Sequence, residues 1–110
     1  MSLSDEERRI MVELEMERAE KITEQFETLR KQQYWDTLVN RMYYAIFHAV
    51  SALMIHNAIS IHTHRGALNA FNKEFVRSYN CFVDATEEEI VPLIEPLKVL
   101  IEKIKAKISE

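Results

Sequence analysis

Apolar residues recur at helical spacing along nearly the whole chain, beginning close to the N-terminus. The first segment, from Ser4 to about Lys31, carries a narrow apolar stripe on an otherwise charged helix. Its members are Ile10, Met11, Leu14, Ala19, Ile22, Phe26 and Leu29. So narrow a stripe is typical of an outer helix that packs by one face and leaves its charges in solvent. Ser4 and Glu7 have capping-box spacing, so the helix is expected to begin at Ser4.

The second segment has the widest apolar cover in the chain. After a turn near residues 32–36, the pattern predicts an amphipathic helix that begins at Trp35 and ends before a loop at residues 57–62. One side of it carries Trp35, Leu38, Val39, Met42, Ile46, Ala49, Val50 and Leu53, and a flanking strip adds Tyr43, Phe47 and Met54. A helix apolar on more than one side is expected to be central, with neighbours around it.

Two more helices are predicted towards the C-terminus. One covers about residues 63–76, and the other follows a second capping-box pattern, Thr86-Glu87-Glu88-Glu89. The last helix carries a seam of Ile90, Ile94, Leu97, Ile101, Ile104 and Ile108, spaced alternately four and three residues apart. We expect this seam to pack against the first helix, and a coiled-coil face for a partner is the alternative. Pro92 and Pro96 are expected to kink the helix or to delay its regular start.

The small number of turn-forming residues agrees with this helical pattern. The 110 residues include one glycine and two prolines, too few for a sheet with many tight turns. We therefore expect an all-α fold, an antiparallel up-down bundle of about four helices, formed by one domain over residues 1–110. A domain of this size buries only roughly 60–70% of its surface, so dimerisation would add stability.

Charge and cysteine content narrow the possible partners and compartments. A net charge of −4 and a pI of about 5.6 argue against coating of duplex DNA. The single cysteine, Cys81, forms no internal disulfide or cysteine-based zinc site and suits a reducing compartment. The acidic N-terminus is unlike a signal peptide, and no apolar run approaches the ~20 residues that span a bilayer. A cytoplasmic protein without a membrane partner is expected.

Arg41, Tyr44 and His48 form the one chemically suggestive group. Arg41 and His48 are seven positions apart, which at ~100° per residue places them on nearly the same helix face, with Tyr44 between them. A neutral imidazole can accept the proton of a ribose 2′-hydroxyl, and a guanidinium can hold a phosphate through two hydrogen bonds. The group could therefore act on one RNA phosphodiester without a metal. A satisfied core histidine and an ordinary surface arginine fit the same spacing.

The segment Asn40–Ala49 resembles the central motif of the HEPN family of small helical proteins. More narrowly, it resembles the branch with an Arg-x-Tyr-Tyr-Ala-x-Phe-His pattern. The next block of that branch, a small hydroxyl residue before His and a later Lys-Glu-Phe run, is matched by Thr63-His64 and Lys73-Glu74-Phe75. The resemblance extends from about Arg18 to Val76. In that branch a further helix follows the Lys-Glu-Phe block, whereas here Val76 runs almost directly into residues 77–82.

The resemblance implies a homodimer in which the Arg and His of two central helices face each other across a cleft. Active members are metal-independent ribonucleases with an Arg-x(n)-His motif, which Arg41 and His48 satisfy with six residues between them. Many are toxins encoded beside a minimal nucleotidyltransferase that neutralises them. Other members are non-catalytic modules that bind a nucleotide or a partner protein, and this alternative stays open.

Residue by residue, the resemblance assigns catalysis to Arg41 and His48. Asn40 and Tyr44 are carried over as substrate-binding residues. His64 either makes a structural hydrogen bond to the neighbouring helix or lines the cleft near His48. RNA or a nucleotide is the expected ligand.

The remaining histidines do not predict a metal site. His56, His62 and His64 lie close together in the sequence, but no cysteine or carboxylate stands beside them at a ligand-like spacing. No metal and no other cofactor is expected.

Overall fold

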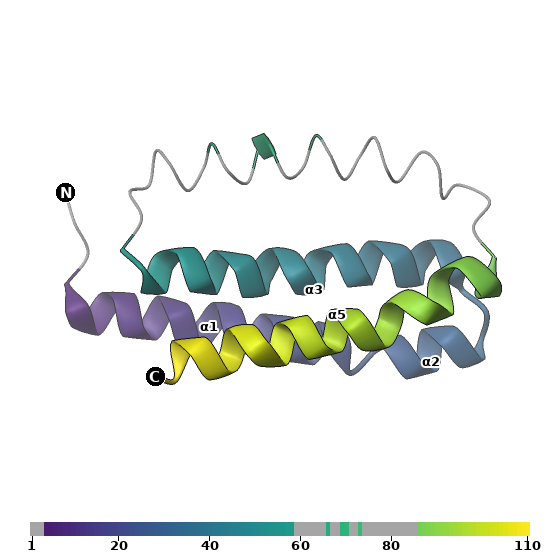
Figure 1. Ribbon diagram of the computed structural model, residues 1–110, viewed down its shortest axis with the longest axis horizontal. Helices are drawn as coiled ribbons and strands as arrows, with labels where there is room; N and C mark the ends of the chain where they lie inside the picture. The colour runs from purple at the N-terminus through teal and green to yellow at the C-terminus, as the bar shows by residue number, and fades with distance from the viewer. Residues whose placement is uncertain (1–3, 59–65, 67–68, 71–72, 74–85) are drawn as a thin grey trace.

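The computed structural model describes residues 4–58, 66, 69–70, 73 and 86–110. Its helices are α1 (Asp5–Thr23), α2 (Phe26–Lys31), α3 (Trp35–His56) and α5 (Glu87–Ile108). α1 runs in one direction, and α3 and α5 both run in the opposite one (Figure 1). The described residues form an all-helical bundle, as predicted. Of the helix predicted over residues 63–76, only four positions are described: Gly66, Asn69, Ala70 and Lys73 have helical backbone and are exposed.

The first helix begins where the sequence predicts but ends earlier. The Ser4 hydroxyl accepts a hydrogen bond from the Glu7 amide, and the Glu7 carboxylate accepts one from the Ser4 amide, both at 3.1 Å. The expected continuous helix to Lys31 is wrong, because α1 ends at Thr23 and α2 starts at Phe26. The Thr23 hydroxyl donates to the Ala19 carbonyl at 2.8 Å, a bond that bends helices. The Gln25 amide then donates a hydrogen bond to the carbonyl of Ile22, only three residues earlier in the chain.

The buried face of α1 differs from the predicted stripe. Ala19 is buried as predicted, but Val12 and Met16 are buried in place of three members of the predicted stripe that are exposed: Ile10, Met11 and Leu14. Both sets repeat at helical spacing, so periodicity alone does not choose between them. The pairing of α1 with α3 decides which set is covered.

The break after α1 turns Phe26 into the core, where its side chain is fully buried. Replacing Phe26 by alanine is therefore expected to lower the free energy of unfolding by about 3–5 kcal/mol through lost burial and the cavity left behind. Denaturant unfolding followed by circular dichroism measures this change. Tyr34→Ala is the control, because this aromatic side chain is exposed and should cost well under half as much. Equal losses in the two variants would contradict the assigned core position of Phe26.

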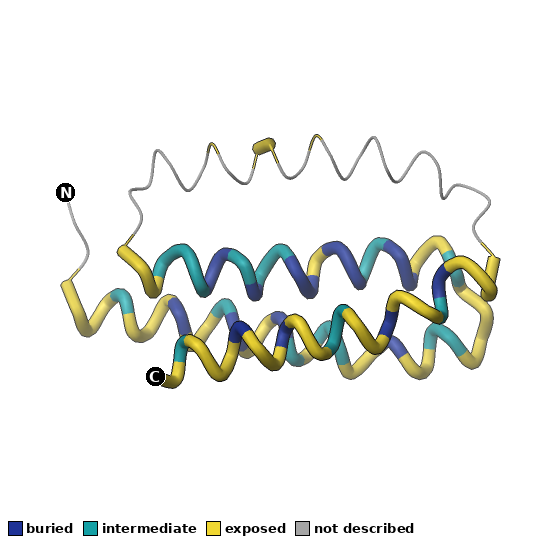
Figure 2. Tube along the Cα trace, in the orientation of Figure 1, coloured by how far each residue is buried: buried dark blue, intermediate teal, exposed yellow. Residues whose placement is uncertain are grey.

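α3 is the central helix, as predicted, and packs against α1, α2 and α5. The turn before it is also confirmed, with Gln33 in the left-handed region at a φ of 61°. Its buried residues are Leu38, Val39, Met42, Tyr43, Ala45, Ile46, Ala49, Ser51 and Ala52. By length and composition alone, α3 would be long and apolar enough to cross a membrane, contrary to the expectation that no run approaches that length. A helix in the core of a bundle passes the same test, and buried residues recur along α3 (Figure 2).

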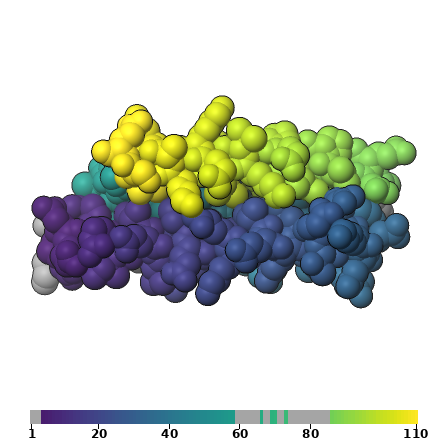
Figure 3. Space-filling model, turned by 90° about the horizontal axis from the view of Figure 1, so that it is seen from below, coloured from purple at the N-terminus to yellow at the C-terminus, as the bar shows by residue number. Residues whose placement is uncertain are grey.

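Four isoleucines of the α5 seam are buried (Ile90, Ile94, Ile101 and Ile104), but α5 packs mainly against α3 rather than against the first helix as predicted. α5 nevertheless lies alongside α1 and α2 (Figure 3), and Lys105 pairs with Glu20 of α1 at 3.0 Å. The two prolines do not delay the helix, which begins at Glu87 and continues through both. Pro92 and Pro96 are exposed, so the helix carbonyls that lose a donor can be solvated.

The second capping box is not formed as predicted. Thr86 is the N-cap of α5, but its side chain makes no hydrogen bond to a helix amide. Its hydroxyl instead donates to the Glu89 carboxylate at 3.2 Å.

Candidate functional site

The residues singled out on α3 lie at the edge of the α1–α3 pair opposite to α5. Glu20 of α1 contacts α5 through Lys105, whereas Glu15 of α1 contacts His48. These two glutamates are five positions apart, which is about 140° around the helix. They mark the two edges of the buried face of α1, so His48 faces away from α5.

The structure brings Arg41, Tyr44 and His48 together on one accessible stripe. The Arg41 guanidinium carbon lies 6.0 Å from the centre of the Tyr44 ring, a cation–π geometry. Tyr44 is 40% exposed, and Arg41 is half-buried. The His48 side chain is 20% exposed, so the bundle does not seal it in the core. Asn40 is half-buried one position before Arg41.

Aromatic rings connect the two ends of this stripe. Phe47 lies between Tyr44 and His48, with its ring centre 6.4 Å from the first and 5.5 Å from the second. The Phe47 and His48 rings are perpendicular, an edge-to-face contact that restrains the imidazole. Burial, with a smaller contribution from Tyr44, raises the pKa of Tyr43. Tyr43 is therefore a neutral phenol packed beside the stripe.

Glu15 is the site residue that the sequence pattern missed. Its Oε2 lies 2.6 Å from the Nδ1 of His48, and its Oε1 accepts a hydrogen bond from Arg18 at 2.9 Å. The Glu15 side chain is only 17% exposed, so the interpretation of all α1 charges as solvated is wrong here. Glu15 follows the buried Val12 by three positions and precedes the buried Ala19 by four, so it borders the buried face of α1, a face that the predicted stripe did not identify in this part of the helix.

Arg41 also lines a groove where α1, the break after it, α2 and α3 meet. The groove has a volume of about 690 Å³. Its lining residues are Lys21, Glu24, Gln25, Thr28, Leu29, Thr37 and Arg41. Across the described ranges of the chain, no carboxylate lies within ion-pair distance of Arg41.

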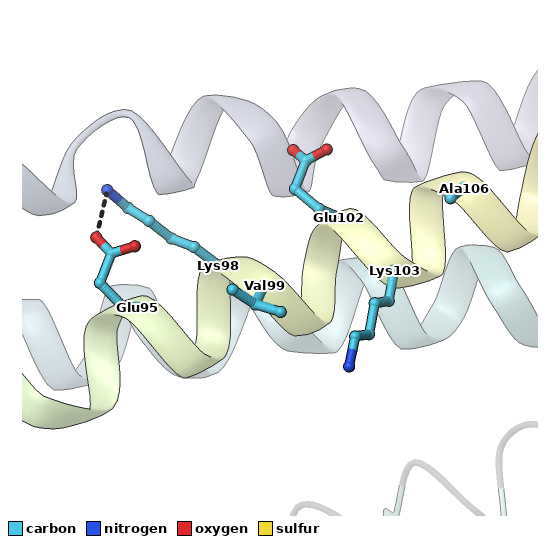
Figure 4. A pocket seen from close by; sticks show the side chains of 6 residues that line it. All are labelled: Glu95, Lys98, Val99, Glu102, Lys103 and Ala106. Carbon is cyan, nitrogen blue, oxygen red and sulfur yellow. Dashed lines mark ion pairs between the residues drawn. The ribbon is translucent and has the colours of Figure 1, made fainter.

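A second hollow lies on the outer face of α5 and has no such chemistry. All its lining residues come from that one helix: Glu95, Lys98, Val99, Glu102, Lys103 and Ala106 (Figure 4). Lys98 reaches back to Glu95 at 3.8 Å, an ordinary surface pair one helical turn apart. This hollow is a shallow solvated surface rather than a second site.

The structure does not place the remaining sequence-predicted residues. His64, suggested as a cleft residue, and His62 lie outside the described residues, as does most of the block from Thr63 to Phe75. Within residues 4–58, 66, 69–70, 73 and 86–110, no group of three histidine, cysteine or acidic side chains could hold a metal ion.

Comparison with known proteins adds family information to this geometry. Over 72 residues the chain is 38% identical to a UPF0332 protein of Thermotoga maritima, covering 66% of this chain and 54% of that protein. Over 89 residues it is 37% identical to a Methanocaldococcus jannaschii protein named as a candidate toxin, covering 79% of this chain and 60% of the relative. The matches thus span little more than half the length of these relatives. No solved structure matches the chain.

A family model provides the broadest match. The model of the HEPN domain matches residues 12–105, which include all of α2 and α3 and most of α1 and α5. The matched region contains Arg41, Tyr44 and His48 as well as Glu15. The chain therefore belongs to the HEPN domain family.

Proposed function

We propose that this protein is a metal-independent endoribonuclease of toxin type that acts as a homodimer. The observation that carries the proposal is the pairing on one α3 stripe of a partly exposed His48 with an Arg41 that lacks a carboxylate partner among the described residues. His48 accepts the proton of a ribose 2′-hydroxyl. The 2′-oxygen then bonds to phosphorus, and the bond from phosphorus to the 5′-oxygen breaks.

Arg41 has two tasks in this reaction. Its planar guanidinium holds the phosphate by parallel hydrogen bonds and stabilises the negative charge that builds on the phosphoryl oxygens. The products are a 2′,3′-cyclic phosphate and a 5′-hydroxyl, which takes its proton from the imidazolium or from water. Tyr44, exposed between the two residues, can donate a hydrogen bond to a phosphate oxygen. Asn40, next to Arg41, is proposed to contact the substrate from the same helix turn.

The homodimer is supported by what surrounds the stripe. Arg41 and His48 are seven positions apart, roughly 10 Å along the helix axis, so a second copy of the helix could bring an arginine and a histidine closer to one phosphate. Exposed Met11 lies on the same edge of α1 as Glu15, four residues before it. Met11 and the exposed Tyr44 would together supply apolar surface that a two-fold interface could bury.

The biological setting is part of the same proposal. One relative carries the name of a candidate toxin, which supports a toxin role and a neutralising minimal nucleotidyltransferase as partner. Such a ribonuclease would act on RNA in the cytoplasm. It needs the 2′-hydroxyl as nucleophile, so DNA is not a substrate.

One observation favours the alternative of a non-catalytic nucleotide-binding module. The groove beside Arg41 falls within the roughly 300–1,000 Å³ range typical of small-ligand pockets. Lys21 and Arg41 could hold phosphates there, and Gln25, Thr28 and Thr37 offer hydrogen bonds. A partner nucleotidyltransferase could use the same surface.

Incubation of the purified protein with RNA in EDTA separates the two functions. The ribonuclease is expected to leave 2′,3′-cyclic phosphate ends and to spare the same sequence with 2′-O-methyl groups, because that substrate lacks the nucleophile. End-group analysis by mass spectrometry identifies the products. A binding module would show nucleotide affinity by calorimetry and no cleavage. Cleavage of the methylated RNA, or activity only after metal is restored, would exclude the proposed reaction.

A further inference from the structure

We infer that Glu15 is a positioning residue that holds the His48 imidazole with its proton on Nδ1, leaving Nε2 as the base. This inference rests on the proposed ribonuclease function for its kinetic consequence. The geometry behind it concerns only residues of α1 and α3, and it can be measured without substrate.

The hydrogen bond dictates the tautomer. Glu15 Oε2 and His48 Nδ1 lie 2.6 Å apart although the residues are 33 positions apart in sequence. An ionised carboxylate can only accept, so Nδ1 must donate. In a neutral imidazole the lone pair then resides on Nε2, the nitrogen that Glu15 does not contact. The bond thereby determines which nitrogen can take a proton from a substrate.

Both oxygens of the carboxylate are occupied, which fixes its orientation. Arg18 donates to Oε1 at 2.9 Å from the next turn of α1, while Oε2 faces His48. The perpendicular Phe47 ring contacts the imidazole from α3. A charged acceptor held in this way also stabilises the imidazolium that forms when the base is protonated. Arg18, Glu15 and His48 thus form a chain from solvent into the stripe.

A purely structural pair between α1 and α3 is the competing explanation. It would stabilise the bundle but would not influence the position of the proton or the rate of the reaction. The test therefore needs a measurement of the ring nitrogens and a separation of kcat from KM, as well as a measure of stability.

Three variants of the full chain separate these explanations. Glu15→Leu removes the acceptor, and Glu15→Gln keeps an amide oxygen that can accept from Nδ1 while removing the charge. Glu13→Gln is the matched control, since Glu13 is exposed two positions away and pairs only with Arg9 among the described residues. Thermal unfolding of each variant reports the contribution of the pair to stability.

Nitrogen NMR of the His48 ring tests the positioning directly. In mildly alkaline buffer, where an ordinary imidazole is neutral, the wild type and Glu15→Gln are expected to show a protonated Nδ1 and a bare Nε2. In Glu15→Leu the proton is expected to distribute over both nitrogens. A His48→Gln spectrum assigns the signals. Identical ring signals in wild type and Glu15→Leu would overturn the inference, whether or not the protein cleaves RNA.

The kinetic readout tests the consequence for catalysis. Glu15→Leu is expected to lower kcat on the order of 10- to 100-fold, by analogy with groups that orient metal-bound histidines. KM should change little, because Glu15 does not touch substrate. Glu15→Gln should fall between Glu15→Leu and wild type. If Glu15→Leu does not fold, the inference is tested on the wild type and on Glu15→Gln. It is overturned if the wild-type His48 ring carries its proton on Nε2 and Glu15→Gln keeps the wild-type kcat. A wild type that does not cleave RNA would instead contradict the proposed function.

Discussion

Replacing His48 by alanine is expected to lower the rate of RNA cleavage by about 100- to 10,000-fold, the range typical of a lost general base. The physical reason is that no other described side chain with a suitable proton acceptor lies on the Arg41–Tyr44 stripe. Glu15 already accepts from His48 Nδ1 and from Arg18, so its two carboxylate oxygens are both engaged. Single-turnover cleavage of a fluorescent RNA in EDTA measures the effect.

The His48→Ala variant also leaves Glu15 without its histidine partner, so a loss of stability must be distinguished from the loss of the base. His48→Gln is the companion variant, because its amide can still donate to the Glu15 carboxylate but cannot act as a base. His56→Ala is the matched control, since His56 is an exposed histidine at the end of the same helix. Full activity in His48→Gln would contradict the assignment of His48 as the base. Loss of activity in His56→Ala would point to a general effect of disturbing α3.

Replacing Arg41 by alanine is expected to lower kcat by about 100- to 1,000-fold, as the loss of one preorganised group that stabilises developing charge does. Arg41→Lys should recover only part of this rate. An ammonium retains the positive charge but cannot form the two parallel hydrogen bonds of a guanidinium. The ranking of arginine above lysine above alanine is the specific signature, and it is read from cleavage rates at saturating RNA.

Arg30→Ala is the control for Arg41. Arg30 is an arginine of α2 whose side chain pairs with Glu27 one turn away, a surface contact of small energetic value. The Arg30→Ala variant should cleave RNA at nearly the wild-type rate. Equal activity of Arg41→Lys and wild type would show that only charge matters at this position. Unchanged activity in Arg41→Ala would remove Arg41 from the reaction.

The local arrangement of the site could be predicted from sequence. Seven residues are close to two turns of any α-helix, so Arg41 and His48 must share a face once the segment is helical. The absence of glycine and proline from Trp35 to His56, together with the wide apolar cover, indicated that central helix. The motif around these residues also indicated the HEPN family, which the match over residues 12–105 shows.

Contacts between helices could not be predicted in the same way. Two apolar stripes of α1 have equally good helical spacing, and only its packing against α3 buries Val12 and Met16 and leaves Ile10 exposed. The same applies to the α5 seam, which was expected on α1 and packs mainly on α3. A heptad seam indicates that the helix packs against another helix, but it does not indicate which one.

The sequence by itself therefore determined the central helix and the stripe of Arg41, Tyr44 and His48, because short-range helical geometry places residues a few positions apart. The tertiary structure alone decided that Glu15 lies against His48. A contact between residues 33 positions apart depends on how α1 turns about its axis against α3. That rotation is set by the packing of whole helix faces, including Phe26 after the break at residues 24–25. No local pattern of apolar residues encodes it.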